Sequence, residues 1–243
     1  MIESIFFELV DSISKVQSRS QGSQTLQDLT KQYGLTHATY LGVNIPTITD
    51  RASPQQAPYF LTTYSDTWCD HYVKTDYVKI DPVIKNGLAG ILPFDWKDLS
   101  RETPAQRKFF GEASEHGLGL NGLSFPIRGA HGETALFSIN SSAQGKAWDD
   151  LKRECVRDFQ IFAYHFHTQV LAAEGVKFAD ASLTRRELEC LKWAAAGKTQ
   201  WETGTIMHIS AETVKVYLEN ARVKLGAINT IQAVTKALSA RLL

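Results

Sequence analysis

Cysteine is scarce in this chain, which has only three among its 243 residues, at Cys69, Cys155 and Cys190. Three widely spaced cysteines do not make a disulfide framework or a zinc site of the usual spacing. The first residues, MIESIFFELVD, lack the basic charge and the apolar length of a secretory signal. No apolar run approaches the ~18 residues that a membrane-spanning helix needs. We therefore expect a soluble, cytoplasmic protein with reduced cysteines and no membrane contact.

Net charge and catalytic groupings are also lacking. The 26 Lys and Arg side chains balance 26 Asp and Glu, although residues 180–243 carry nine basic and six acidic ones. A mildly basic terminal segment on a mildly acidic body is typical of a DNA-binding module joined to another domain. No Ser/His/Asp or Cys/His set stands out, and His165 and His167 would point apart on a helix. We expect no enzyme activity, no cofactor and no metal.

Hydrophobic spacing predicts the helices of the first three-quarters of the chain. Residues 3–33 have helical spacing, with a Gln/Ser/Gly break at 17–24. Further helices are predicted at 66–75, at 104–116, where Thr103 precedes Pro104 as a cap, and at 149–173.

β-branched and aromatic residues predict strands at 37–45, 59–64, 123–128 and 134–141. A hairpin turn at 129–132 joins the last two. The whole pattern predicts an α+β fold, in which an α/β/α sandwich surrounds a mostly antiparallel sheet and a four-helix module follows. We place the domains at 1–174 and 182–243, with a linker at 175–181.

The C-terminal module has the pattern of a helix-turn-helix. Ser182 or Thr184 can cap a first helix that ends at Gly197, and residues 200–207 form a second. Ser210 caps the third helix, which is the one that such modules place in the major groove of DNA. A fourth helix at 230–242 is apolar on one side and could pair with its own copy.

These residues resemble the LuxR-type helix-turn-helix. The resemblance lies in Leu183-Thr-x-x-Glu187, Trp193-Ala-x-x-Gly197-Lys-Thr, Ser210-x-x-Thr213-Val214-Lys215 and Lys224-Leu225-Gly226. Two positions depart from the family pattern, since Tyr217 stands where His is usual and Thr203 where Ile is common. The expected DNA contacts are Lys198, Thr199, Ser210, Thr213, Lys215, Val216 and Lys224.

A set of aromatic and acidic residues in the first domain suggests a small-molecule sensor. Tyr64, Trp68 and Tyr72 recur at four-residue steps and would share one side of a helix. Trp and Tyr each combine an apolar ring with one polar group, and Asp81 before Pro82 adds a strong acceptor. A phospho-receiver domain, the other common partner of such modules, needs a parallel α/β alternation that the chain lacks. The pocket suits an uncharged amphiphile with carbonyl groups and an N–H.

Together these residues resemble the signature of acyl-homoserine-lactone receptors, the quorum-sensing branch of the same family. The resemblance implies that Trp68 donates to the lactone carbonyl and that Asp81 accepts the amide N–H. It further implies that Tyr64 and Ser138 bond the acyl carbonyl, that Tyr72 and Trp96 pack around the lactone, and that Gly122 leaves room for ligand. Strand alternation and proximity suggest an acyl pocket of Ala38, Tyr40, Phe60, Cys69, Val83 and Leu123, which favours a short, branched or aryl acyl group.

The sequence thus predicts a transcription regulator that binds an acyl-homoserine lactone and, as a homodimer, a two-fold promoter site in double-stranded DNA. The helix at 149–173 is the candidate dimer contact, with Phe162, Phe166 and Val170 facing either the sheet or the partner. A regulator that is independent of ligand remains an alternative. So does an anti-activator that acts by heterodimerisation, because Tyr217 could alter a DNA contact.

Overall fold

The computed structural model describes residues 2–45, 59–119, 121–130, 132–176 and 183–243. Within these ranges the chain divides into two compact units, of which the larger is α+β and the smaller is all helical. The predicted fold class is therefore confirmed. The linker predicted at 175–181 falls mostly on residues outside the described ranges, and the domain boundaries stay a prediction. Among the helices that the structure describes, none combines the length and hydropathy needed to cross a bilayer.

One antiparallel sheet forms the centre of the larger unit, with the strand order β2-β1-β5-β4-β3. The strands are β1 (His37–Asn44), β2 (Tyr59–Thr62), β3 (Phe94–Asp95), β4 (Asn121–Arg128) and β5 (Thr134–Ser141). Four of them match the predicted strands to within two residues at each end. The turn between β4 and β5 closes with Gly129 N–H donating to Glu133 O, and its residue 131 lies outside the described ranges. β3 has only two residues and gives no pattern in the sequence.

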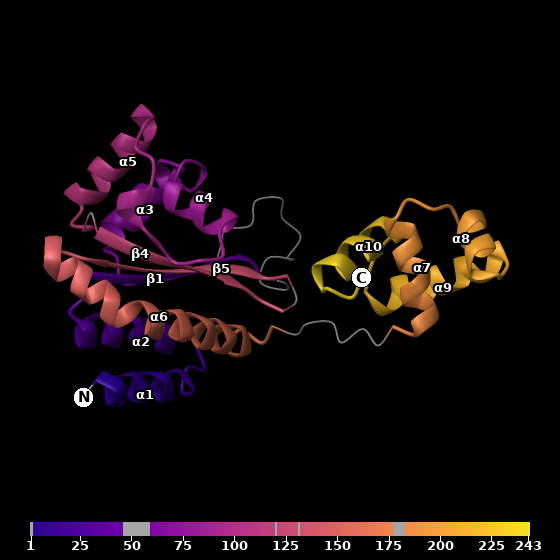
Figure 1. Ribbon diagram of the computed structural model, residues 1–243, viewed down its shortest axis with the longest axis horizontal. Helices are drawn as coiled ribbons and strands as arrows, with labels where there is room; N and C mark the ends of the chain where they lie inside the picture. The colour runs from indigo at the N-terminus through magenta and orange to yellow at the C-terminus, as the bar shows by residue number, and fades with distance from the viewer. Residues whose placement is uncertain (1, 46–58, 120, 131, 177–182) are drawn as a thin grey trace. The chain divides into compact units, whose positions relative to one another are not determined.

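Helices cover both faces of the sheet, as the ribbon view shows (Figure 1). One face carries α3 (Asp66–Lys74), α4 (Pro82–Ala89) and α5 (Pro104–Glu115). The other carries α2 (Arg19–Tyr33) and α6 (Gly145–Ala173), and α1 (Ile2–Ile13) packs against these two helices. Two 3₁₀ turns, η1 (Tyr77–Lys79) and η2 (Trp96–Asp98), join elements on the first face.

Local capping explains where several of these helices begin. Thr103 and Gln106 form a reciprocal capping box at the start of α5, as the Thr103-Pro104 pair suggested. Ser18 caps α2, so the predicted break at 17–24 is too long and ends at residue 18. The sequence prediction also missed α4, whose cap is Asp81 and whose first residue is Pro82.

The long helix α6 packs its aromatic side chains onto the sheet. Phe162 lies 5.1 Å from Phe137 between ring centroids, and Phe166 lies 5.5 Å from Tyr40. Phe162, Phe166 and Val170 are 0–2% exposed within a single chain. The structure therefore places Phe162 and Phe166 against the sheet and buries Val170 within the single chain, so none of the three faces a partner subunit. A dimer contact through α6 would have to use its outer face, where Ile161 is 42% exposed.

The smaller unit is formed by α7 (Arg185–Ala195), α8 (Gln200–Met207), α9 (Ala211–Lys224) and α10 (Thr230–Ser239). Thr184 caps α7, and the alternative cap, Ser182, lies outside the described ranges. Ser210 caps α9 as predicted. Gly204 on α8 permits a close approach, since a Cβ there would lie 2.7 Å from the Ile209 carbonyl oxygen in the following turn. The α8-turn-α9 geometry of a helix-turn-helix results.

Candidate functional site

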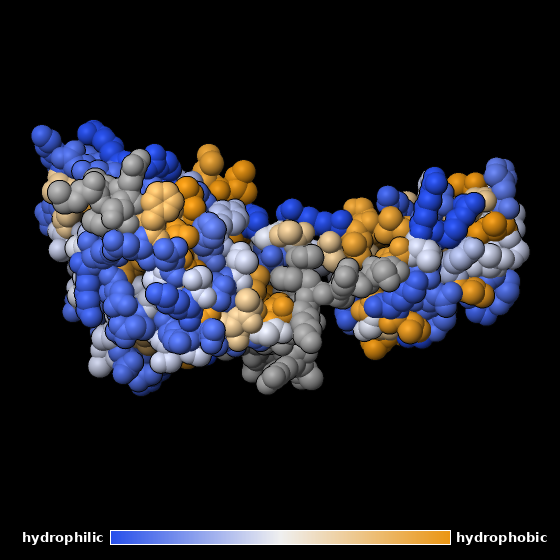
Figure 2. Space-filling model, turned by 90° about the horizontal axis from the view of Figure 1, so that it is seen from below, coloured by the Kyte–Doolittle hydropathy of each residue, from blue (hydrophilic) through white to orange (hydrophobic). Residues whose placement is uncertain are grey.

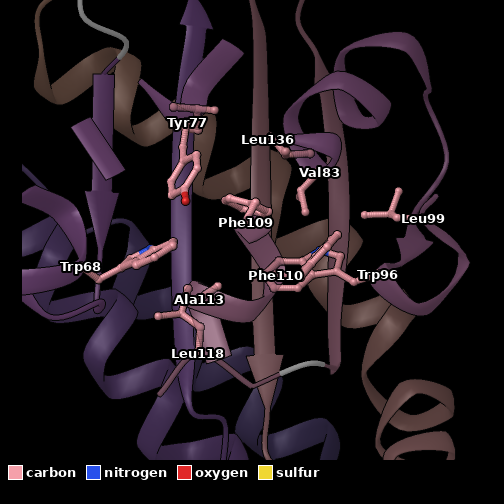
Figure 3. Close-up of a cluster of buried hydrophobic side chains, with 11 residues drawn as sticks. Trp68, Tyr77, Val83, Trp96, Leu99, Phe109, Phe110, Ala113, Leu118 and Leu136 are labelled. Carbon is pink, nitrogen blue, oxygen red and sulfur yellow. The ribbon is translucent and has the colours of Figure 1, made fainter. Parts of the chain in front are cut away.

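A cavity of about 720 Å³ lies between the sheet and helices α3, α4 and α5 of the larger unit. Trp68, Phe109 and Trp96 project over the strands from three different elements, and the cavity lies among such side chains (Figure 3). Its wall is mainly apolar, with polar groups supplied by a few side chains. This is the usual composition of a small-molecule site.

Six of the seven predicted ligand residues line this cavity. They are Tyr64, Trp68, Tyr72, Asp81, Trp96 and Ser138. They come from the segment between β2 and α3, from α3, from the cap of α4, from η2 and from β5, so the fold gathers residues up to 74 positions apart. Their contact with a ligand stays a prediction, but their convergence on one cavity is a fact of the structure.

The seventh residue, Gly122, makes room for Trp96 and is not part of the cavity wall. A Cβ at Gly122 would overlap the Trp96 indole, with Cδ2 as its nearest atom. The indole therefore packs flat against the strand only because this position has no side chain. The structure thus shows room left for Trp96, which lines the cavity, and the expected room for ligand at Gly122 stays a prediction.

Three of the six residues suggested for the acyl pocket are wrong, because the alternate residues of β1 and β4 were assigned to the wrong face of the sheet. Phe60, Cys69 and Val83 line the cavity. Tyr40 points to the opposite face, where its hydroxyl lies 2.7 Å from His167 Nδ1 on α6. Ala38 is two residues from Tyr40 on β1, so its side chain points to that same face. Leu123 on β4 and Ala38 are both Cα partners of Ile139 on β5, so Leu123 also points away from the cavity.

The cavity also contains residues that the sequence did not single out. On β1 the alternate residues Thr39 and Leu41 face it, and β5 adds Leu136. Phe109 and Ala113 of α5 close it from above. Thr39 and Leu41 would have been predicted if the alternate residues of β1 had been counted from Thr39 instead of Ala38. The residues of α5 have helical spacing but no local sign of which face meets a ligand.

Asp81 is the most buried charged group in the cavity wall, at 8% exposure. Its Oδ2 accepts from the Tyr72 hydroxyl at 2.9 Å, and its Oδ1 accepts from the Val83 backbone N–H at 2.7 Å. Burial raises the pKa of Asp81 to about 6, although these hydrogen bonds favour the charged form. The same environment, with the Asp81 charge nearby, raises the pKa of Tyr72 and keeps its phenol neutral. A fixed carboxylate with unused lone pairs can accept an N–H from a ligand.

The smaller unit presents the first turns of α8 and α9 to solvent. Thr199 and Ser210 are the caps of these helices, and each accepts a backbone N–H through its side chain. Helix N-termini with free N–H groups suit phosphate oxygens. Val216 is 51% exposed on α9, one turn into the helix. On the side shown in Figure 2, the larger unit is mostly hydrophilic, and the smaller unit shows both hydrophilic and hydrophobic residues.

The three lysines predicted to contact DNA differ in the ion pairs that they form within the chain. Lys198, just before α8, pairs with Glu202 of that helix at 3.7 Å, and Lys215 pairs with Glu212 within α9 at 3.4 Å. Both ion pairs are exposed, so they are weak and can rearrange. Lys224 instead lies 2.8 Å from Glu187, whose side chain is 4% exposed. Lys224 therefore neutralises a buried carboxylate on α7, which competes with the predicted contact to a phosphate.

Comparison with known proteins gives matches to both units. Residues 18–170 match the family model "Autoinducer binding domain", and residues 181–237 match "Bacterial regulatory proteins, luxR family". The transcriptional activator protein RaiR of Rhizobium etli is 35% identical over 175 residues, 71% of this chain and 72% of RaiR. LuxR of Aliivibrio fischeri is 26% identical over 96% of this chain and 92% of LuxR.

Solved structures share the fold. A crystal structure of Escherichia coli SdiA has a TM-score of 0.68 at 20% identity, and the match covers 100% of this chain and 99% of that one. A structure of SdiA in complex with octanoyl-rac-glycerol has a TM-score of 0.67 at 19% identity over 98% of this chain and 94% of that one. At this level of identity the likeness shows the fold alone.

Proposed function

The chain belongs to the luxR family of bacterial regulatory proteins and carries an autoinducer binding domain, and we propose that it is a quorum-sensing transcription regulator. In this proposal residues 1–174 bind an acyl-homoserine lactone, and residues 182–243 bind a two-fold promoter site. The chain acts as a homodimer in the cytoplasm. The family is one of transcription regulators, not enzymes.

The observation that carries the ligand proposal is the polarity of the cavity wall. Asp81 can only accept when ionised, whereas the Trp68 indole can only donate. Tyr64 and Ser138 add hydroxyl groups that can donate to a carbonyl. An acyl-homoserine lactone has one amide N–H, an acyl carbonyl and a lactone carbonyl, which this set complements group by group. A fatty acid or a monoacylglycerol has no amide N–H for Asp81.

The shape of the cavity bears on the acyl tail. Phe60, Cys69 and Val83 give the wall an apolar surface beyond the polar groups. We propose a short, branched or aryl tail, because aromatic and β-branched side chains crowd this surface. The wall also includes Val73 and Val78, which are 78% and 40% exposed, so this side of the cavity is the route by which a longer tail would reach solvent.

Ligand would act by stabilising the larger unit. A largely apolar cavity left without ligand forgoes dispersion contacts and hydrophobic burial. A ligand that binds only the native state stabilises it by RT ln(1 + [L]/Kd), about 2.7 kcal/mol at 100 times Kd. A stable sensor unit is then available for dimer formation and DNA binding.

Native mass spectrometry of the full chain tests this function directly. The purified protein is incubated with acyl-homoserine lactones bearing short, branched, long and aryl tails, and with octanoylglycerol as an acyl ligand without an amide. We expect one lactone per chain for one tail class and a dimer in its presence. Retention of octanoylglycerol alone would make this a receptor for another acyl compound. A folded dimer that binds no ligand would favour a ligand-independent regulator.

DNA selection completes the test. The dimer is used to enrich a duplex library of random sequence, and the proposed function predicts a selected site with two-fold symmetry. Lys215→Ala and Val216→Ala should weaken or change the selection, because both side chains project from the exposed face of α9. Normal ligand binding without any DNA selection would instead favour an anti-activator that acts through heterodimers.

A further inference from the structure

A row of hydroxyl groups crosses the sheet at the cavity. Thr62 on β2 pairs with Thr39 on β1, Thr39 pairs with Ser138 on β5, and Ser138 pairs with Ser124 on β4. Residues that are direct partners in neighbouring strands have their side chains on the same face of the sheet. Thr39 and Ser138 line the cavity, whereas Ser124 is 0% exposed and outside its wall.

The Trp96 indole sets the direction of hydrogen bonding at the β4 end of the row. Its Nε1–H donates to Ser124 Oγ at 2.8 Å, and Ser124 Oγ lies 2.7 Å from Ser138 Oγ. An indole nitrogen only donates, so Ser124 accepts from it and must still place its own proton. Within the described residues, Ser138 Oγ is the one further partner of that hydroxyl. Ser124 therefore donates to Ser138, because a buried donor without an acceptor is costly.

The β2 end of the row also accepts a hydrogen bond from outside the row. The Tyr64 backbone N–H donates to Thr62 Oγ1 at 3.0 Å, and Thr62 Oγ1 lies 2.8 Å from Thr39 Oγ1. Thr62 accepts from the amide, and either hydroxyl of the Thr62–Thr39 pair can be the donor in their mutual hydrogen bond. The hydroxyl groups of the row thus meet at the facing residues Thr39 and Ser138, both of which line the cavity.

We propose that Ser124 is a positioning residue that makes Ser138 a hydrogen-bond donor toward the cavity. With its oxygen occupied by the Ser124 proton, Ser138 turns its own proton to the ligand. The sheet side of the cavity then selects an acceptor such as an acyl carbonyl, while Asp81 selects a donor. The inference rests on the proposed function, since it concerns how the same cavity orients a ligand amide.

A double-mutant cycle between Ser124 and Ser138 tests this role. Calorimetry measures the affinity of the wild type, Ser124→Ala, Ser138→Ala and the double variant for N-hexanoyl-homoserine lactone, or for the tail class that the mass spectrometry selects. We expect each single variant to lose about three- to tenfold in affinity. The double variant should lose no more than Ser138→Ala alone, because Ser124 acts only through Ser138. Losses that multiply, or wild-type affinity in Ser124→Ala, would overturn the proposal.

Two controls separate positioning from packing. Ser124→Cys nearly keeps the side-chain volume but has a weaker donor, so its loss should be smaller than that of Ser124→Ala. A loss in Ser124→Cys equal to or larger than that in Ser124→Ala would point to packing and contradict the proposal. Melting of the ligand-free variants reports any general loss of stability.

A measurement without lactone keeps the inference separate from the proposed function. The Trp96 indole N–H signal in an NMR spectrum should shift in Ser124→Ala, which removes the acceptor of the indole. It should also shift in Ser138→Ala, because Ser124 there loses the acceptor for its own proton. Ser138 has no direct bond to the indole, so an unshifted signal in Ser138→Ala would contradict the chain even if lactone binds. A wild-type protein that binds no lactone, but shows both shifts, would refute the function and leave the hydroxyl chain standing.

Discussion

Acidification should weaken ligand binding through Asp81. The pKa of this carboxyl is about 6 because the fold buries it, and only the ionised form is a charge-assisted acceptor for a ligand N–H. At about pH 5, one unit below that value, roughly one-tenth of the ligand-free protein is ionised at this group. If binding requires the charge, apparent affinity falls by about tenfold between neutral pH and pH 5. A neutral lactone has no titration of its own in this range.

Calorimetry of the wild type and of Asp81→Asn between about pH 5 and pH 8 measures this effect. An amide cannot ionise and its oxygen is a weaker acceptor, so at neutral pH the variant should bind about 10- to 150-fold more weakly, equivalent to 1.5–3 kcal/mol. Its affinity should also change little with pH. Asp98→Asn, at an exposed aspartate of η2, is the matched control and should behave as the wild type. Equal pH dependence in the wild type and Asp81→Asn would refute the assignment.

Through Asp81, acidification should stabilise the ligand-free protein, although it weakens ligand binding. Folding raises the pKa of this carboxyl above its usual value of 3.8, so the folded state favours the protonated acid. The contribution of Asp81 is therefore fully present below that value and is lost as pH rises through about 6. The difference in unfolding free energy between the wild type and Asp81→Asn, followed by chemical denaturation across this window, isolates the effect from other titrating groups.

Three further variants test other parts of the structure. Gly122→Ala should lower the melting temperature and weaken lactone binding, because the new methyl group displaces Trp96; normal values for both would contradict the close packing. Asn140→Leu should stabilise the protein by about 1–3 kcal/mol in chemical denaturation, since the buried Asn140 amide has no partner among the described residues. Lys224→Ala should destabilise the smaller unit by a similar ~1–3 kcal/mol by leaving the buried Glu187 without its ion-pair partner, whereas loss of DNA affinity at unchanged stability would restore Lys224 as a phosphate contact.

The sequence predicted the elements whose pattern is local and repeated. α6 is long enough for its apolar spacing to be read, and Thr103 and Ser210 are caps with a clear chemical role. β3 escaped because two residues are too few for a period to emerge, and α4 was missed although its cap Asp81 and Pro82 at its first position are helix-start signals. The sequence left open which side of α6 meets the sheet, since Phe162 could equally have served a partner surface.

The candidate site was predictable where one residue type carries the chemistry. The resemblance singled out Trp68 and Asp81, and their side-chain chemistry is that of a donor and an acceptor. The error at Ala38 and Tyr40 arose because both faces of the sheet are covered by helices, so both parities on β1 are apolar and buried. The role of Ser124 could not be predicted, because it depends on a register between strands and on an indole 28 residues away.

The central claim is that this chain is a sensor whose fold is stabilised by an acyl-homoserine lactone. Thermal melts of the wild type, Asp81→Asn and Asp98→Asn, each with lactones of short, branched, long and aryl tails, test it most directly. The account predicts a large rise in melting temperature for one tail class in the wild type and in Asp98→Asn, and little or none in Asp81→Asn. A flat response across the panel, from protein that is folded without ligand, would contradict it.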